Sequence, residues 1–234
     1  MGLNSLPFGK IPQSKNALFH NSQLFFFVVA AGFSGVNHST QKIYSPTMDE
    51  KDKKVLLSIA RKSIESAITG TPNEQTQIEI TSQELKEKSG AFVTLRTHGK
   101  LRGCIGRMVS DIPLHKLVPE MAVSAAKEDP RFNQIQPSEL EGLEIDISAL
   151  SPLQKIDDPL DFELGWHGIY IIKGASNGCF LPQVATETGW TKEEFLSQCC
   201  SMKAGLSPDA WRKKDIEVYI FTTETISEKI NKNG

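Results

Sequence analysis

Apolar positions along residues 48–70 recur three and four residues apart, which predicts an amphipathic α-helix. Acidic side chains occupy its first turn, where the helix dipole favours negative charge, and Gly70 marks its end. A second helix is predicted to begin at Pro113 and to end before the Asp-Pro pair at residues 129–130, because the residue before a proline is pushed out of the α region. Pro119 is expected to kink or split this helix.

Alternating apolar and polar residues, or short runs rich in β-branched residues, predict strands along much of the chain. A capping box of Thr191 and Glu194 predicts a further helix that Gly205 ends, and helical turns are expected around Leu85 and from Ser207 to Trp211. Strands grouped as hairpins, with helices between the groups, favour an α+β fold with an antiparallel or mixed sheet flanked by helices. The predicted strands cover residues 91–97, 101–105, 143–150, 169–173, 179–181 and 215–224, with a short one at 77–80.

Residues 1–47 differ in pattern from the rest of the chain. Two lysines precede the apolar run Leu24–Phe33, which resembles the core of a signal peptide and is shorter than the roughly 20 residues that a membrane-spanning helix needs. The favoured interpretation is a disordered leader, or upstream sequence translated from a misplaced start, because Met48 opens the first predicted helix. We therefore expect a folded domain over residues 48–234 that is cytoplasmic, or exported if the first 47 residues are a genuine signal peptide.

The composition narrows the range of functions. With 39% apolar and 23% charged residues, 234 residues suit one folded domain. A net charge of -2, with no basic run interleaved with aromatic residues, argues against nucleic acid as a partner. The four cysteines have neither the spacing of a zinc site nor the CxxxCxxC spacing of a radical-enzyme cluster, so no metal or cofactor is expected.

The most specific candidate for a functional site is LRGCIG at residues 101–106, because two glycines weaken a strand that only needs to pack. In a regular strand Arg102 and Cys104 project to the same face, so the guanidinium would favour the thiolate and both residues become catalytic candidates. Gly103 and Gly106 would then let a ligand approach closely. The alternative is a bulge or tight crossing in which Cys104 is a small buried residue. No histidine is obviously placed to act as a base for this thiol.

Five further residues lie beside the ends of elements or on a polar strand face, where binding sites often form. Asp129 and Arg131 belong to a charged turn after the second helix, and local capping is the alternative role for this pair. Asp146 lies on the polar face of a strand, where it either lines a cleft or meets solvent. Gln183 follows a proline, and Lys203 lies near the end of a predicted helix. We assign these five residues, with the two glycines, to substrate binding.

Six motifs occur in the order and rough spacing of one known family: GAFVTL, LRGCIG, EDPRF, IDISALSP, FLPQV and KAGL. By these motifs, residues 48–228 resemble the AMMECR domain family. The resemblance implies a larger part that holds both chain ends and an antiparallel sheet, a smaller inserted helical part, and a cleft between them. Asp146 departs from the family pattern, where Glu is common, so its carboxylate has less reach. The family signature falls on Arg102, Gly103, Cys104, Ile105, Gly106, Asp129, Arg131, Phe132, Pro182, Gln183, Lys203, Ala204 and Gly205.

Prokaryotic members of this family are associated with a Memo-like protein and a radical S-adenosylmethionine (SAM) enzyme, as protein A of the AmmeMemoRadiSam system. If this chain is prokaryotic, the resemblance implies those two partners. We therefore expect an accessory or catalytic component of a modification system, which binds a small molecule or a modified peptide in a cleft near Cys104. The alternatives are a non-enzymatic adaptor for other proteins and, more distantly, a thiol-dependent enzyme acting alone. The sequence leaves open whether the chain is an enzyme.

Overall fold

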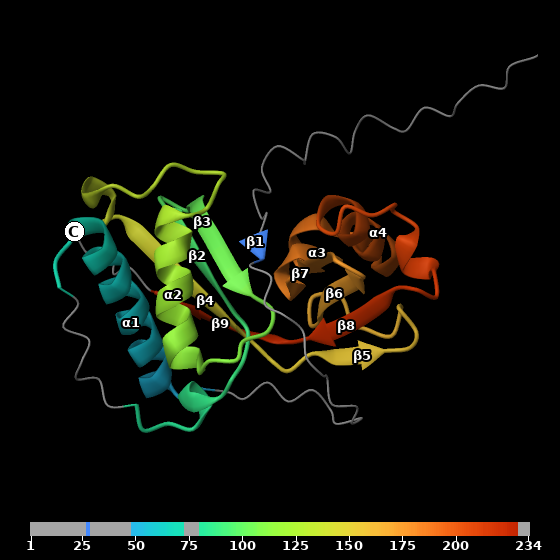
Figure 1. Ribbon diagram of the computed structural model, residues 1–234, viewed down its shortest axis with the longest axis horizontal. Coiled ribbons are helices and arrows are strands. Elements are labelled where there is room, and N and C mark those ends of the chain that lie inside the picture. Colours follow the sequence, from blue (N-terminus) through green and yellow to red (C-terminus); the bar gives the residue numbers. More distant parts are fainter. Residues whose placement is uncertain (1–26, 29–47, 73–79, 229–234) are drawn as a thin grey trace, which may run out of the picture.

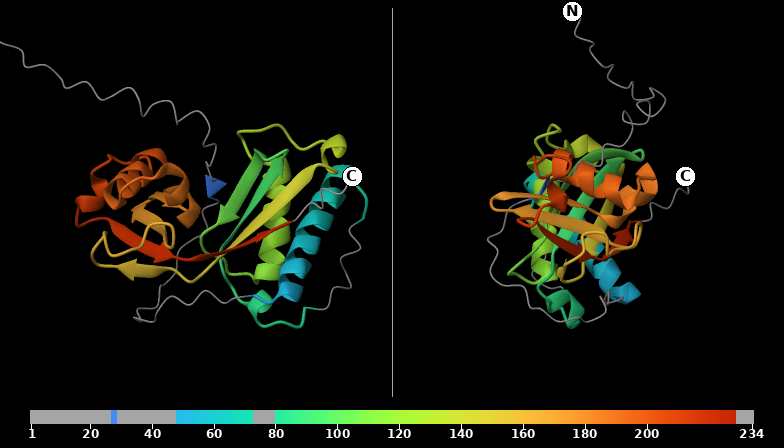
Figure 2. Two further views of the ribbon diagram at one scale, coloured as in Figure 1. Left: turned by 180° about the vertical axis from the view of Figure 1, so that it is seen from behind. Right: turned by 90° about the vertical axis from the view of Figure 1, so that its right-hand side faces the viewer.

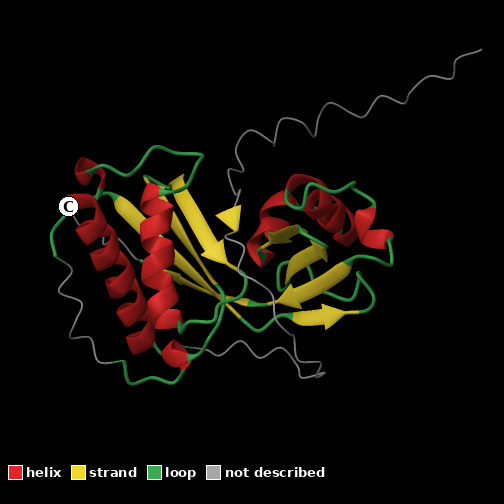
Figure 3. Ribbon diagram, viewed as in Figure 1, coloured by secondary structure: helices red, strands yellow, loops and turns green. Residues whose placement is uncertain are grey.

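The computed structural model describes residues 27–28, 48–72 and 80–228, which form two lobes joined by two crossing segments (Figure 1). The larger lobe contains a five-stranded sheet of order β1-β3-β2-β4-β9, and the smaller lobe contains a four-stranded sheet of order β5-β8-β6-β7. All strand pairs are antiparallel except β1 with β3. The α+β class is therefore confirmed, although the inserted lobe is not purely helical, as the secondary-structure colouring shows (Figure 3).

The larger lobe is built from β1 (Phe27–Val28), α1 (Glu50–Thr69), β2 (Ala91–Thr97), β3 (Lys100–Arg107), α2 (Leu114–Lys127), β4 (Leu143–Leu150) and β9 (Thr223–Ser227), with short 3-10 helices η3 (Glu84–Lys86) and η4 (Pro137–Glu139). The smaller lobe is built from β5 (Gln154–Ile156), β6 (Gly168–Lys173), β7 (Ser176–Phe180), α3 (Pro182–Thr188), α4 (Lys192–Met202), η5 (Ala210–Arg212) and β8 (Glu217–Phe221). Most predicted elements are confirmed. The pattern missed α3 and β5, which are short and lack a clear apolar period.

The first predicted helix is α1, and its ends are fixed by local chemistry. The Asp49 side chain accepts a hydrogen bond from the backbone N–H of Asp52 at 2.7 Å, and Gly70 adopts the left-handed conformation with φ 74°. Pro119 was expected to kink or split the second helix, and the split is wrong, because α2 is continuous. The proline lies in the second turn, where it forfeits one backbone bond, and the buried apolar face of α2 outweighs that loss.

The predicted strand over residues 215–224 is in fact two strands that belong to different sheets. The chain leaves the smaller sheet at Phe221 and enters the larger sheet at Thr223. Between them, Thr222 donates its N–H to Ser151 Oγ at 2.9 Å and accepts the N–H of Ser151 at 3.0 Å. These two hydrogen bonds join the two segments that cross between the lobes. The alternation of apolar and polar residues along one strand does not reveal such a crossing.

The two faces of the larger sheet pack against different parts of the molecule. Helices α1 and α2 pack side by side on one face, as the front and rear views show (Figure 1 and Figure 2). Val93, Leu95 and Ile145 belong to the apolar core that these helices share with the sheet. On the opposite face, Phe92 and Cys104 belong to the apolar core of the smaller lobe. The LRGCIG strand is therefore sandwiched between the helices and the second lobe.

Two predicted segments fall wholly or partly outside the described residues. Of residues 1–47, the structure describes only Phe27–Val28, which pair in parallel with Ile105–Gly106 at the outer edge of β3. The short strand expected at residues 77–80 lies mostly outside the described part, whereas the helical turn at Leu85 is present as η3. Among the helices of the described residues, none is long and apolar enough to cross a membrane.

Candidate functional site

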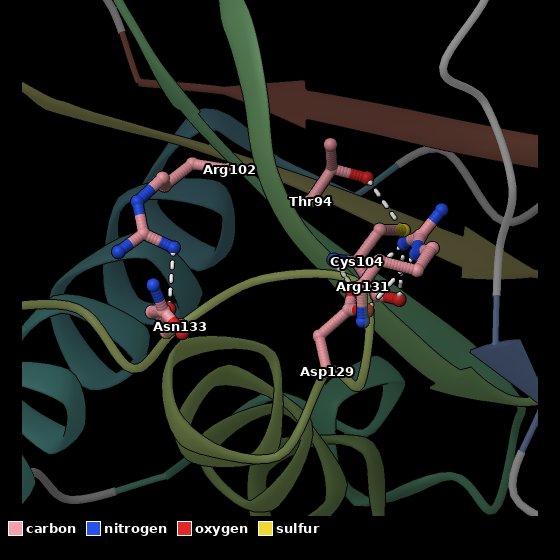
Figure 4. Close-up of polar contacts among 6 residues, drawn as sticks. All are labelled: Thr94, Arg102, Cys104, Asp129, Arg131 and Asn133. Carbon is pink, nitrogen blue, oxygen red and sulfur yellow. Dashed lines mark hydrogen bonds and ion pairs between the residues drawn. The ribbon is translucent and has the colours of Figure 1, made fainter.

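Cys104 lies at the centre of β3 with its side chain sealed between the two lobes. The residue is 1% exposed, and its Sγ lies 3.1 Å from the hydroxyl oxygen of Thr94 on the neighbouring strand (Figure 4). Burial raises the pKa of the Cys104 thiol to about 12, and the hydrogen bond with Thr94 and the charge of Arg131 offset only part of that effect. The expectation of a stabilised thiolate is therefore wrong for this conformation.

The charged turn after α2 closes the outer edge of β3 at this cysteine. The backbone N–H of Cys104 donates to Asp129 Oδ2 at 2.8 Å, and its carbonyl accepts from Arg131 Nη2 at 3.3 Å. Arg131 also donates to both carboxylate oxygens of Asp129, at 2.9 and 2.6 Å. An acidic and a basic side chain thus replace the strand that would otherwise pair with the backbone of Cys104.

The contacts that join Asp129 to Arg131 and to the backbone of Cys104, here called the clasp, favour an ionised Asp129. Burial alone would raise its pKa, but the hydrogen bonds from Arg131 and from the N–H of Cys104 outweigh burial and hold the pKa below its usual value. The Asp129 side chain is 1% exposed, whereas the Arg131 side chain is 22% exposed. The predicted pair is therefore brought to Cys104, and the face of the pair that reaches solvent is basic.

Arg102 does not share a surface with Cys104. Its guanidinium pairs with the Glu139 carboxylate at 2.7 and 3.0 Å and donates to the carbonyls of Asn133 and Gln134 (Figure 4). The cause is an irregularity in the β2–β3 ladder, where Leu95 pairs with Gly103 but the next residue of β2 pairs with Leu101. Because such a bulge re-aims a side chain, the two-residue spacing that predicted one face fails here. The Arg102–Cys104 pairing is a wrong prediction.

The two glycines of the motif make room for the protein itself. A Cβ on Gly103 would lie 2.2 Å from the carbonyl oxygen of Ala125 in α2, and a Cβ on Gly106 would lie 2.3 Å from the Phe92 ring. Both positions are therefore filled by packing, which is the alternative that the sequence left open. Neither glycine faces open space where a ligand would approach, so their assignment to substrate binding is not supported by this geometry.

Lys203 reaches the same region from the smaller lobe. It follows the last residue of α4, and its Cβ occupies space that Gly178 leaves open, since a Cβ there would lie 2.5 Å away. The Nζ atom lies 5.8 Å from the centre of the Phe180 ring. Burial lowers the pKa of this amine; nearby Cys179 and other thiols oppose the shift, and the positive charge of Arg131 adds to it. Lys203 and Arg131 therefore approach Cys104 from opposite lobes.

Asp146 of β4 is the cross-strand partner of Thr94, whereas Gln183 lies in α3 of the smaller lobe. Asp146 accepts a hydrogen bond from Arg96 Nε at 3.3 Å, so the shorter carboxylate still finds a cationic partner. Burial raises the pKa of Glu187 in α3, and the charge of Arg96 partly offsets this shift, which places the arginine between the two lobes. Gln183 occupies the second position of that same short helix and is partly buried. The sequence did not single out Arg96, although it shares the polar strand face with Thr94.

Two hollows of the described structure lie away from Cys104. One, of about 540 Å³, lies between α1 and α2, and another, of about 780 Å³, lies at the end of the smaller sheet beside η5. Neither is lined by the residues predicted from the sequence as a site. Within the described ranges, no group of three or more His, Cys, Asp and Glu side chains is placed to hold a metal ion.

Comparisons with known proteins agree with this architecture. The AMMECR1 family model matches residues 57–226, so the chain belongs to the AMMECR1 family. It is 40% identical over 183 residues to Protein MK0488 of Methanopyrus kandleri, which covers 74% of this chain and 87% of that protein. It is also 40% identical over 184 residues to Protein TK0174 of Thermococcus kodakarensis, with 74% and 89% coverage.

A solved structure shares the fold. The crystal structure of uncharacterized protein PH0010 from Pyrococcus horikoshii superposes with a TM-score of 0.71 at 35% sequence identity. The match covers 80% of this chain and 96% of that one. The two-lobed α+β arrangement is therefore that of a known fold.

Proposed function

We propose that this chain is a binding component of a radical SAM and Memo-associated modification system. In this role it holds a small molecule or a modified peptide beside the LRGCIG strand, where the two lobes meet around Cys104, Arg131 and Lys203. We call this place the seam. The observation that carries the proposal is that Arg131 donates to the carbonyl of Cys104, while Lys203 of the opposite lobe lies near enough to Arg131 for that charge to lower the pKa of its amine. Partly desolvated cations of this kind bind anionic groups more strongly than cations on an open surface do.

The same geometry favours binding over thiol chemistry. A nucleophilic cysteine needs an accessible thiolate, whereas Cys104 is buried and its pKa is raised to about 12. Its backbone, held by Asp129 and Arg131, positions the arginine instead. An accessory role therefore fits the described residues better than a thiol-dependent enzyme acting alone.

A co-purification experiment tests both halves of the proposal. The full chain, tagged and expressed in its own host, is isolated, and the small molecules and peptides that it retains are identified by mass spectrometry. We expect one retained species in the wild type and in Lys214→Met, an exposed control, and its loss in Lys203→Met. Identical extracts from all three proteins would contradict a ligand at the seam. Failure to recover the host's radical SAM enzyme or Memo-like protein with the chain would contradict the association.

The adaptor alternative is favoured by a specific feature of the smaller lobe. Trp166 is 59% exposed and Leu164 is 37% exposed, and both lie in the turn between Glu163 and His167. Three hydrogen bonds close this turn, including one from the N–H of Glu163 to His167 Nδ1 at 2.9 Å. A rigid, exposed tryptophan is a frequent anchor of protein interfaces. For the adaptor alternative, we infer that another protein would dock at this turn.

Charge adds to this alternative. Four exposed carboxylates precede or flank the tryptophan, and none forms an ion pair with another described residue: Asp157, Asp158, Asp161 and Glu163. A partner with a basic surface around an apolar pocket would complement this turn. Binding of the purified Memo-like protein would then weaken by about tenfold or more in Trp166→Ala. Equal binding of wild type and variant would remove the turn from the interface.

A further inference from the structure

The outer edge of β3 changes character within two residues. At Cys104 the outward-facing N–H and carbonyl groups are bound by the side chains of Asp129 and Arg131 instead of by a strand. The backbone groups of successive residues in an antiparallel ladder point alternately to the two sides of the strand. Those of Ile105 therefore face β2, and those of Gly106 face outward again. Gly106 is the next position beyond the clasp at which another strand can pair.

The structure holds an extended segment at this position. Phe27 and Val28 form β1, which pairs in parallel with Ile105 and Gly106 and lies beside the outer edge of β3 (Figure 1). The pairing spans only two residues of β1 and joins parts of the chain that are far apart in the sequence. A sheet edge that accepts one short segment can accept another, because the main-chain hydrogen bonds of an added strand depend little on its sequence.

Arg131 lies next to this edge and gives it a chemical preference. In a parallel strand, the residue that precedes the one opposite Ile105 comes opposite Cys104, where the guanidinium donates to the carbonyl at 3.3 Å. The Nη1 atom of Arg131 forms no hydrogen bond with another described residue, and the side chain is 22% exposed. An acidic side chain at that position of an added strand can therefore pair with Nη1.

We propose that the outer edge of β3 at Gly106 binds an extended peptide as an added parallel strand. The peptide carries an acidic residue opposite Cys104, followed by two apolar residues of the kind that β1 places there. Phe27 and Val28 occupy the edge until such a peptide displaces them. This inference rests on the proposed function, because it states how a peptide ligand is held at the seam.

Amide hydrogen exchange of the full chain, followed by NMR spectroscopy, tests whether β1 occupies the edge. The double variant Phe27→Pro, Val28→Pro removes both N–H donors of β1 and so prevents the pairing. The amide of Gly106 should then exchange about tenfold faster, as expected for the loss of one or two backbone hydrogen bonds. The amide of Ile105, which faces β2, is the internal control and should not change. Equal exchange of Gly106 in the wild type and the variant would overturn the occupation by β1.

A peptide probe tests the binding of a partner at the same edge. The blocked peptide Lys-Glu-Phe-Val-Thr-Lys is added to the double variant, and the matched control peptide has Gln in place of Glu. We expect the Glu peptide to slow the exchange of Gly106 towards the wild-type rate, and to bind about threefold more tightly than the Gln peptide, because its carboxylate meets Arg131. If neither peptide slows the exchange, the strand addition is overturned. Equal binding of both peptides supports the strand addition and overturns the acidic requirement.

The outcomes separate this inference from the proposed function. If neither peptide affects Gly106 while Lys203→Met still loses the species retained by the wild type, the binding role of the seam stands and only the strand addition fails. Protection of Gly106 in the wild type that increases with protein concentration would show that the strand comes from a second copy of the chain. That result supports the edge as a site of strand addition and overturns its occupation by the same chain.

Discussion

The seam around Cys104 and the turn around Trp166 hold charge in opposite ways. At the seam, Asp129 is buried and tied to Arg131, and the cations from both lobes are partly withdrawn from water. At the turn, four carboxylates stay exposed and without ion pairs among the described residues, beside a tryptophan that is 59% exposed. A charge withdrawn from water depends on its partner, because loss of either one leaves the other buried and uncompensated, whereas exposed charges mainly steer an approaching partner.

This difference predicts which variants unfold the protein and which ones leave it folded. A change at the seam should remove stability together with any function. A change at the turn should remove only the binding of another protein.

Asp129→Ala should cause the largest loss of stability. It leaves Arg131 without its partner and the N–H of Cys104 without an acceptor. Removing one partner of a buried pair costs about 3 to 5 kcal/mol, and the partial exposure of Arg131 places this case near 3 kcal/mol. Urea unfolding measures the effect. A loss below about 1 kcal/mol would show that the clasp contributes little.

Gly103→Ala should come next, because the new methyl group would meet the carbonyl of Ala125 at 2.2 Å. Overpacking of this kind costs about 1 to 3 kcal/mol. Gly142→Ala is the matched control, since its Cβ would meet only Thr97 at 4.0 Å. Thermal unfolding of the two variants should differ clearly. Similar midpoints would mean that α2 does not approach the strand as closely as the structure shows.

Acid should lower the free energy of unfolding, because it protonates Asp129 at the seam. Its folded pKa is lowered, so the stabilisation is present above the unfolded pKa of about 3.9 and is lost as the pH falls through the folded pKa. The difference in unfolding free energy between the wild type and Asp129→Asn should therefore be largest near neutral pH and shrink below about pH 4. A series of urea titrations would reveal the trend, and a difference that stays constant in acid would contradict it.

Trp166→Ala should change stability least, by within about 0.5 kcal/mol, because an exposed side chain has little packing to lose. Trp211→Ala, at a buried position in the same lobe, is the contrasting variant and should cost about 3 kcal/mol or more. Calorimetry compares the two. Substantial destabilisation by Trp166→Ala would show that the turn belongs to the core and not to an interface.

The sequence predicted the elements well, because helix caps, apolar periods and hairpin turns are local signals. It also selected LRGCIG, Asp129, Arg131 and Lys203 as candidate site residues. The structure brings Asp129 and Arg131 to the backbone of Cys104 in that motif, and Lys203 approaches from the other lobe. It failed for Arg102, because one bulge reverses the direction of a side chain without any local mark in the sequence.

Other failures have the same origin in long-range structure. The glycines signalled close approach, but whether a ligand or a helix fills the space depends on where α2 packs. The last predicted strand divides at Thr222 because it pairs with two different sheets, and pairing partners are set by the whole chain. The role of Arg96 between the lobes was missed for the same reason, since Glu187 comes from a distant segment.

Alkylation of Cys104 decides whether the seam works through its charged side chains or through this thiol. The native chain is treated with iodoacetamide from pH 6 to 9, conditions chosen around the free-thiol pKa of about 8.5, and the modified sites are mapped by mass spectrometry. Because its pKa is raised to about 12, we expect slow labelling of Cys104 that rises with pH over this whole range without reaching a plateau, and that becomes fast once urea unfolds the chain. Rapid labelling of the folded protein, with an apparent pKa below the free-thiol value, would contradict it.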